Sequence, residues 1–242
     1  MNLNATGNTF RIMEFMLDKP FRREWIRQHP LPQDGIIWID RNRDLFHMDF
    51  YNCDGSTAKI CGNGARACLY FLFKTLPLRQ QQWISLSTDA GVLKGKVETD
   101  ESVMVSMPEP QWVKTIDSKL GSIDLIDLGN RHIVLRLPSS RSVINADLSK
   151  IAGTIRDSSP ELHTCNVNVF ANTGNEVWIR TFENGVEKET QSCGSGSMAV
   201  CFVLQQQNPV SLQSWLLHTV GGSLAVKFMA PDYYLQGKVV ME

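Results

Sequence analysis

The sequence lacks long apolar segments and has no excess of either charge. Its longest near-apolar run, around residues 69–73, is far shorter than the ~20 residues that a helix needs to cross a bilayer. The formal net charge is -1 over 242 residues, so neither a basic nucleic-acid-binding surface nor an acidic tail is indicated. Residues 1–10 lack the apolar core of a signal peptide. We therefore expect a cytoplasmic protein that binds neither nucleic acid nor a membrane.

The cysteines lack the spacing of a metal site. No CxxC pair or Cys/His cluster matches a zinc motif, so we expect no metal. An even number of cysteines suggests disulfides, but a chain of this length can build a core without crosslinks and shows no export segment. We expect reduced thiols, most of them buried. The six cysteines are Cys53, Cys61, Cys68, Cys165, Cys193 and Cys201.

An internal repeat is the most informative feature. The segment CGNGARACLYFL, which begins at Cys61, aligns with CGSGSMAVCFVL, which begins at Cys193. The cysteine, both glycines, one alanine and the last leucine coincide. A weaker match pairs Gly7-Asn8 with Gly129-Asn130, and strand-like segments at 44–51 and 176–182 precede the two cysteine motifs. Several features in the same order indicate a duplicated unit.

The repeat predicts an α+β fold of two similar domains. Residues 65–73 and 198–204 are apolar on nearly every face, so each should form a helix that is buried all round. We expect each domain to be a mixed β-sheet or barrel wrapped around one such helix. The expected domains are 1–112, which carries Cys61, and 113–242, which carries Cys193. Strands are also expected at 35–40, 83–87, 102–107, 122–128, 132–137, 166–171, 223–228 and 234–240.

The two cysteine motifs suggest acid–base chemistry. At the start of a helix, free backbone N–H groups and the helix dipole favour a thiolate and bind carboxylates, while glycines let a ligand approach the backbone. Two such helix ends on one substrate fit the inversion of an amino-acid α-carbon: a thiolate removes the proton and a thiol returns one to the opposite face. A lone cysteine at a helix start is more often a core residue. Repetition beside glycines favours the catalytic interpretation of Cys61 and Cys193.

At these motifs the sequence resembles the diaminopimelate epimerase family. The matching segments are Gly7-Asn-Thr-Phe10, Asn52-Cys-Asp-Gly-Ser56, Cys61-Gly-Asn-Gly-Ala-Arg66, Gly129-Asn-Arg-His132, Asn166-Val-Asn168 and Glu189-Thr-Gln-Ser-Cys-Gly-Ser-Gly196. The resemblance implies two domains, each a strand barrel around a central helix, with the active site in the cleft between them. It also implies an isomerase that uses no pyridoxal phosphate or other cofactor, acts on a small-molecule substrate that is a free amino acid, and employs Cys61 and Cys193 as its acid–base pair. A homodimer is an expected assembly.

The resemblance also implies which residues bind the substrate. The backbone at the two cysteine motifs would hold the reacting carboxylate, and the other residues would line the pocket. The implied binding residues are Asn8, Asn52, Gly62, Asn63, Asn130, His132, Asn166, Glu183, Asn184, Gly194 and Ser195.

One departure from the family bears on the substrate. The family has Glu-Arg-Gly where this chain has Glu183-Asn184-Gly185, and that arginine contacts the distal carboxylate of diaminopimelate. An asparagine cannot form the same charge-assisted pair, although Arg131 or Lys188 could supply a cation. Diaminopimelate, a precursor of lysine and peptidoglycan, is therefore the default substrate. A racemase of another amino acid, such as histidine or O-ureidoserine, is the alternative.

Two further hypotheses remain open. An isomerase of the kind found in phenazine biosynthesis shares the scaffold, but it uses a carboxylate base and lacks the cysteine pair. A non-catalytic amino-acid-binding protein would tolerate the loss of Cys61 and Cys193.

Overall fold

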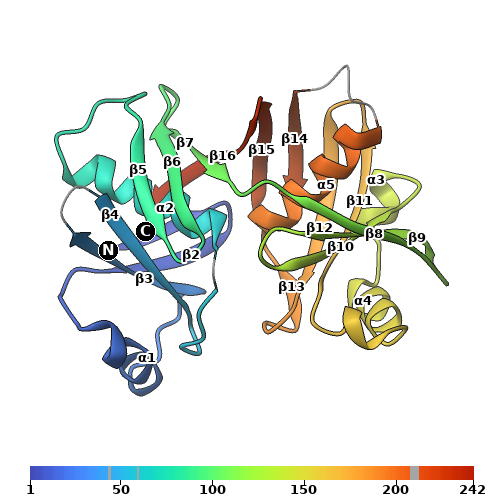
Figure 1. Cartoon of the computed structure of the whole chain (residues 1–242), viewed down its shortest axis with the longest axis horizontal. Helices are drawn as coiled ribbons and strands as arrows, with labels where there is room; N and C mark the ends of the chain where they lie inside the picture. Colours follow the sequence, from blue (N-terminus) through green and yellow to red (C-terminus); the bar gives the residue numbers. More distant parts are fainter. Residues whose placement is uncertain (43–44, 59, 208–212) are drawn as a thin grey trace. The chain divides into compact units, whose positions relative to one another are not determined.

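The computed structural model describes residues 1–242 except 43–44, 59 and 208–212, and it divides the chain into two units (Figure 1). The N-terminal unit comprises Met1–Ser106 and Gln236–Glu242, and the C-terminal unit comprises Met107–Leu235. The division therefore falls before the expected 112/113 boundary, and the last residues return to the N-terminal unit. They do so because the end of strand β16 (Asp232–Met241) pairs with β1 (Asn2–Ala5).

The N-terminal unit is a closed array of strands. Its neighbour order runs from β1 through β7 to β16, and β16 pairs back onto β1. The pairs β2/β3 and β4/β5 are parallel, whereas β1/β2, β3/β4, β5/β6 and β6/β7 are antiparallel. The remaining strands are β2 (Asn8–Met13), β3 (Gly35–Asn42), β4 (Leu45–Asn52), β5 (Ile84–Thr88), β6 (Gly91–Val97) and β7 (Ser102–Met107).

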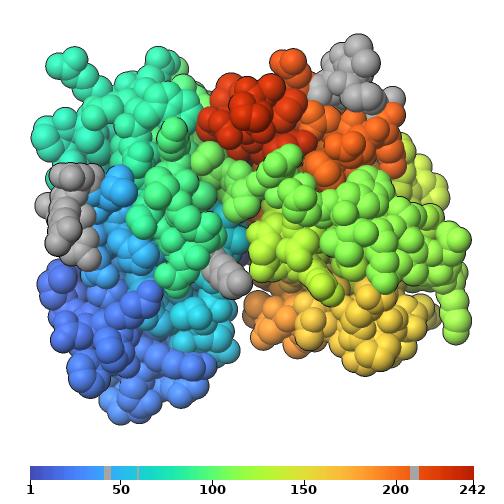
Figure 2. All heavy atoms as spheres, viewed as in Figure 1, coloured from blue at the N-terminus to red at the C-terminus, as the bar shows by residue number. Residues whose placement is uncertain are grey.

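Helix α2 (Gly62–Thr75) occupies the centre of this unit. It contacts β1, β2, β3, β4, β5 and β6, and nearly all residues from Gly62 to Leu72 are buried. Strands β5 and β6 cover its front in Figure 1, and their side chains form part of the green surface of this unit in Figure 2. Helix α1 (Lys19–Gln28) lies outside the barrel, where Ile26 packs against Ile36, Trp38 and Tyr51.

The C-terminal unit repeats the plan. Its strands follow the order β8-β9-β10-β11-β12-β14-β15-β16, with β13 paired to β12. Helix α5 (Gly194–Gln207) is buried from Gly194 to Leu204 against β9, β10, β11 and β15. The strands are β8 (Gln111–Ser118), β9 (Gly121–Asp127), β10 (Arg131–Arg136), β11 (Asn166–Thr173), β12 (Glu176–Glu183), β13 (Lys188–Thr190), β14 (Ser214–Thr219) and β15 (Gly222–Met229). The short helices are α3 (Ser140–Ile144), α4 (Leu148–Arg156) and η1 (Pro160–Leu162).

Strand pairing confirms the duplication seen in the sequence. In the N-terminal unit the series β2/β3, β3/β4, β4/β5, β5/β6 is parallel, antiparallel, parallel, antiparallel. The series β10/β11, β11/β12, β12/β14, β14/β15 has the same alternation. Gly7 and Gly129 lie in the corresponding hairpin turns with φ of 85° and 92°, a conformation that favours glycine.

The predicted α+β class is confirmed, and both predicted helices lie within α2 and α5. The expected strands are present with shifted ends, except that residue 44 lies outside the described residues. Strands β1, β2, β6, β8, β13 and β14, and the helices outside the barrels, were not predicted. In the described part of the chain, no helix has the length and apolar character needed to span a membrane.

Candidate active site

Cys61 is the N-cap of the central helix of the N-terminal unit. Its backbone is extended, with φ -136° and ψ 99°, and its Sγ accepts a hydrogen bond from the N–H of Gly64 at 3.3 Å. The carbonyl of Cys61 accepts the first helical hydrogen bond, from Ala65, at 2.8 Å. The thiol side chain thus occupies the position in which Ser, Thr and Asp usually cap helices, where a negative charge is stabilised.

Two predicted binding residues meet beside this helix end. Asn63, in the first turn of α2, donates from Nδ2 to Oδ1 of Asn8 at 2.5 Å. Its own Oδ1 accepts from Nη2 of the buried Arg66 at 2.7 Å. Asn8 is the first residue of β2, directly after the Gly7 turn. The structure therefore brings Asn8 and Asn63 together on the side of Cys61.

Asn52 has a local partner at the end of β4. Its Nδ2 donates to Oγ of Ser56 at 2.9 Å, and its backbone N–H donates to the Ser56 carbonyl at 2.8 Å. Gly55, with φ of 80°, closes the same turn by donating to the Asn52 carbonyl at 2.9 Å. These contacts give Asn52 a turn-closing role within the segment that leads to Cys61.

Cys193 repeats the geometry of Cys61 at the start of α5. Its Sγ accepts from the N–H of Gly196 at 3.4 Å, and its carbonyl accepts from Ser197 at 2.9 Å. The surroundings differ, however, because Cys193 is buried near the Glu183 carboxylate. Burial, followed by the charge of Glu183, raises the pKa of Cys193 well above its ordinary value. Burial and Glu183 therefore oppose the thiolate-favouring effect that the sequence predicts for a cysteine at a helix N-terminus.

Ser195 connects Cys193 to the Gly129-Asn130 turn. Oγ of Ser195 lies 3.6 Å from Sγ of Cys193 and accepts from Nδ2 of Asn130 at 3.3 Å. Oδ1 of Asn130 is buried and has no hydrogen-bond partner among the residues that the structure describes. A buried acceptor of this kind is one that a bound donor, such as an ammonium group, would satisfy.

His132 lies fully buried on β10, next to Asn168. Nδ2 of Asn168 donates to the Ile133 carbonyl at 3.0 Å, so this amide must turn its nitrogen toward the ring and Nδ1 of His132, 3.2 Å away, must accept. Burial lowers the pKa of His132 to about 3, so the ring is neutral and its proton is on Nε2. Within the described chain Nε2 has no hydrogen-bond partner, which leaves a buried donor beside Asn168.

Asn166 braces the backbone around Arg131 and Asn184. Its Nδ2 donates to the Arg131 carbonyl at 3.3 Å, and its Oδ1 accepts from the N–H of Asn184 at 3.0 Å. The Arg131 side chain is half exposed, and its Nε lies 3.9 Å from Oδ2 of Asp127. Lys188 stands opposite Glu183 in the β12/β13 register, so both side chains lie on one face.

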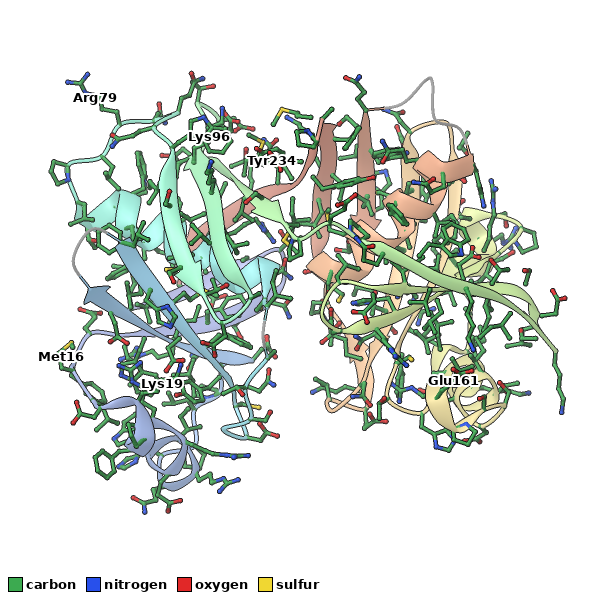
Figure 3. The ribbon with its side chains drawn as sticks, in the orientation of Figure 1. Met16, Lys19, Arg79, Lys96, Glu161 and Tyr234 are labelled. Atoms are coloured by element: carbon green, nitrogen blue, oxygen red, sulfur yellow. The ribbon has the colours of Figure 1, made fainter. Side chains whose placement is uncertain are left out.

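Another group of potential metal ligands lies in the N-terminal unit. His47, Asp49 and Asp89 offer ligand atoms within 4.8 Å of one another. Nζ of Lys19, which Figure 3 labels between α1 and the strands, lies 3.0 Å from Asp49 and 3.4 Å from Asp89. The buried guanidinium of Arg22 lies 2.9 Å from Asp49. These cations already neutralise the carboxylates, so the group is an ion-pair network.

The C-terminal unit also has a surface hollow of about 560 Å³ whose lining includes Trp178, Arg180, Glu189 and His218. Arg180 forms a two-pronged ion pair with Glu189, at 2.6 Å for each contact, and donates to the carbonyls that end α3. No candidate site residue lines this hollow, and its charged groups are already paired.

The comparisons with known proteins identify the family. A profile described as diaminopimelate epimerase matches residues 21–113. A diaminopimelate epimerase from Thermotoga maritima is 28% identical over 99% of this chain and 98% of its own. One from Campylobacter lari is 32% identical over 97% of this chain and 93% of its own.

The chain belongs to the diaminopimelate epimerase family. This epimerase-family protein is thus an isomerase, an amino-acid racemase or epimerase. Its fold also resembles a solved phenazine biosynthesis protein of the PhzF family from Bacillus anthracis, with a TM-score of 0.76, 12% identity and coverage of 97% of this chain and 91% of that one. At that identity the likeness concerns the fold alone.

Three supporting residues of this epimerase-family chain were not singled out from the sequence. Arg66 holds Asn63, Asn168 holds His132, and Thr181 donates to Oδ1 of Asn168 at 2.9 Å. Arg66 and Asn168 lie inside the quoted motifs, and a charged residue within an otherwise apolar helix was the available signal for Arg66. Nothing in the local sequence marks Thr181.

Proposed function

We propose that this protein inverts the α-carbon of a free amino acid with two thiols, Cys61 and Cys193, and needs no cofactor. The observation that supports the proposal most strongly is the repeated geometry of the two cysteines. Each precedes the buried central helix of its unit, and each sulfur accepts a hydrogen bond from the glycine N–H three residues later, at 3.3 Å and 3.4 Å. Packing alone gives no reason to build this arrangement twice.

The proposed reaction is a proton exchange across the α-carbon. One cysteine, as thiolate, takes the α-proton, so the Cα–H bond breaks and an S–H bond forms. The other cysteine, as thiol, gives its proton to the opposite face. The substrate carboxylate takes on enolate character in between, and backbone N–H groups at the helix starts stabilise that charge. No net electron or atom transfer is needed.

The electrostatics suggest which cysteine starts as the acid. The raised pKa of Cys193 keeps it as a thiol at neutral pH. Cys61, which is only partly buried and caps α2, would then be the base in the first proton transfer. In the reverse reaction the roles exchange, because the thiolate and the thiol have changed places.

Diaminopimelate is the proposed default substrate, as named for the two relatives. The enzyme would then supply the precursor of lysine and peptidoglycan. Asn184 supports the alternative of a different amino acid, because it offers no charge for a distal carboxylate. Arg131 and Lys188 are the candidate cations. Substitution of each by Gln would raise the KM for diaminopimelate if its cation contacts that carboxylate.

The test is α-proton exchange in deuterium oxide, followed by NMR. The panel contains LL- and meso-diaminopimelate, histidine, lysine, serine and O-ureidoserine. Exchange with none of them would contradict the proposed function. Exchange with histidine or O-ureidoserine, but not with diaminopimelate, would favour the alternative substrate.

The thiol mechanism is tested by Cys61→Ala and Cys193→Ala. Each variant is expected to lose net racemisation while retaining some exchange with one enantiomer, because one acid–base group remains. Cys53→Ala, which removes the exposed cysteine, is the matched control and is expected to keep full activity. Full racemisation by either of the first two variants would overturn the mechanism, and a protein that binds an amino acid without exchange would be a binding protein.

A further inference from the structure

Arg66 is a buried charge that the proposed reaction does not use. It lies on α2, one turn beyond Asn63, and its side chain is 0% exposed. Buried guanidinium groups are rare unless paired, because removal of the charge from water is costly. Burial lowers the pKa of Arg66 to about 9, and the charge of Cys61 as a thiolate opposes that shift, so the side chain remains a cation at neutral pH.

The hydrogen-bond partners of Arg66 are neutral and come from three places in the N-terminal unit. Nη1 donates to Oγ1 of Thr6 at 3.2 Å and to the carbonyl of Lys238 at 3.3 Å, and Nη2 donates to Oδ1 of Asn63 at 2.7 Å. One planar side chain therefore joins the β1/β2 turn, strand β16 and the first turn of α2. A lysine, with a single donor nitrogen, could not span the same partners.

The chemistry of the guanidinium fixes the orientation of two amides. A guanidinium only donates, so the Asn63 atom that faces Arg66 must be the oxygen. Nδ2 of Asn63 then points to Asn8 and donates to its Oδ1 at 2.5 Å. Because Nδ2 of Asn63 can only donate, the Asn8 atom that faces it must be the oxygen. The amide nitrogen of Asn8 therefore points away from Asn63. The orientation passes from Arg66 through Asn63 to Asn8.

Arg66 also holds the turn that carries Asn8. Thr6 and Gly7 both have positive φ, 56° and 85°, and Thr6 is a non-glycine residue in that strained region. The hydrogen bond from Arg66 holds Thr6, and Oδ1 of Asn4 accepts from the N–H of Gly7 at 2.8 Å. The position of Asn8 therefore depends on Arg66 by two routes.

We propose that Arg66 is a positioning residue, which orients the amides of Asn63 and Asn8 so that Asn8 presents N–H donors to a carboxylate of the substrate. The inference rests on the proposed function, in which Asn8 lines the substrate pocket. Without Arg66 the two amides can turn over. A carbonyl oxygen would then face the substrate carboxylate, and binding would weaken.

The test compares kinetic constants in single and double variants, with a panel substrate that the wild-type protein turns over. Arg66→Met is expected to raise KM about tenfold or more, with a smaller change in kcat, because a hydrogen bond to a charged ligand group is lost. Asn63→Ala is expected to raise KM to a similar extent. If Arg66 acts through Asn63, the double variant will be no worse in KM than Asn63→Ala. Arg66→Lys is expected to recover part of the loss.

The matched control is Arg156→Met. Arg156 is another largely buried arginine, whose Nε and Nη2 donate to the Cys165 carbonyl at 2.9 Å and 2.7 Å. Its loss is expected to lower the unfolding temperature without a change in KM. An unchanged KM in folded Arg66→Met, or fully additive effects in the double variant, would overturn the inference.

Two further measurements test the inference if Arg66→Met does not fold or if no panel substrate is turned over. Asn63→Asp keeps the contact with Arg66 but replaces the donor that faces Asn8, so it is expected to raise KM, and an unchanged KM would overturn the inference. In the ligand-free protein, hydrogen exchange of the Asn63 side-chain amide, followed by NMR, is expected to be at least about tenfold faster in Arg66→Lys. Equal exchange rates in Arg66→Lys and the wild type would overturn the inference about Arg66. If no panel substrate reacts, that result contradicts the proposed function but leaves this test of Arg66 intact.

Discussion

Gly196 and Asn168 lie so close together that a methyl group on Gly196 would overlap Oδ1 of Asn168. Asn168 cannot easily move, because it accepts from Thr181 at 2.9 Å and donates to the Ile133 carbonyl at 3.0 Å. The second glycine of the Cys193 motif is therefore needed for contact between the helix start and β11. The same Asn168 orients His132, so the glycine connects the helix start to that side chain.

Gly196→Ala is expected to destabilise the protein by about 1–3 kcal/mol, the usual cost of overpacking in a well-filled interior. Gly153→Ala is the matched control. Gly153 lies in helix α4 with nothing within 4 Å of an added Cβ, so alanine there is expected to stabilise by about 0.4–1 kcal/mol. Urea unfolding of both variants measures the difference. A Gly196→Ala protein as stable as the wild type would show that the Asn168 side chain can move to make room for the added methyl group.

His132 is expected to make the fold sensitive to acid. Its folded-state pKa is about 3, below the value of about 6.5 in an unfolded chain. Between about pH 6.5 and pH 3 the His132 side chain is therefore protonated in the unfolded state and neutral in the folded state. The contribution of neutral His132 to the free energy of unfolding is fully present above about pH 6.5. It falls by about 1.4 kcal/mol for each pH unit from there toward pH 3.

His132→Gln is therefore expected to reduce the slope of stability against pH between about pH 6 and pH 4. The measurement is urea unfolding at several pH values, with the exposed His163→Gln as control. Parallel slopes for wild type and His132→Gln would show that His132 takes up its proton in the folded state.

The fold was predictable where the sequence pattern reflected burial directly. Helices α2 and α5 are apolar on nearly all faces, and such segments can only lie at the centre of a unit. Strand β6 was missed because Gly91 and Gly95 look like turn residues. A Cβ on Gly95 would overlap Leu69 of α2 and the Met104 carbonyl, so this glycine records close packing of helix and strands.

The sequence predicted which residues form the candidate site, but it did not predict the pKa shift of Cys193. The repeated motif singled out Cys61 and Cys193, and the structure gives them the same helix-start geometry. The raised pKa of Cys193 depends on burial and on the approach of Glu183 from β12, which is set by tertiary packing. The role of Arg66 likewise depends on partners at positions 6 and 238, far away in the sequence.

Asp49→Asn is expected to destabilise the N-terminal unit by about 3–5 kcal/mol, the usual cost of a broken buried ion pair. Asp49 is 1% exposed and accepts from Arg22 at 2.9 Å and from the hydroxyl of Tyr51 at 2.8 Å. Its loss leaves the 2%-exposed Arg22 with Asp40 as its remaining carboxylate. Asp40→Asn, at a 22%-exposed side chain, is the control and is expected to cost less. The measurement is thermal unfolding. An equal loss of stability in Asp49→Asn and Asp40→Asn would contradict the prediction.

Iodoacetamide is expected to modify Cys61 before Cys193. The thiolate is the reactive form, and burial together with Glu183 raises the pKa of Cys193, whereas Cys61 is only partly buried. The experiment uses a Cys53→Ser background, since Cys53 is exposed and would react first. Peptide mass spectrometry at pH 8 is expected to show faster labelling of Cys61, because the raised pKa of Cys193 lowers its thiolate fraction and its burial limits access of the reagent. In urea the two rates are expected to converge. Faster labelling of Cys193 in the folded protein would mean that Cys193 holds the thiolate and Cys61 the proton, which would reverse the proposed order of acid and base.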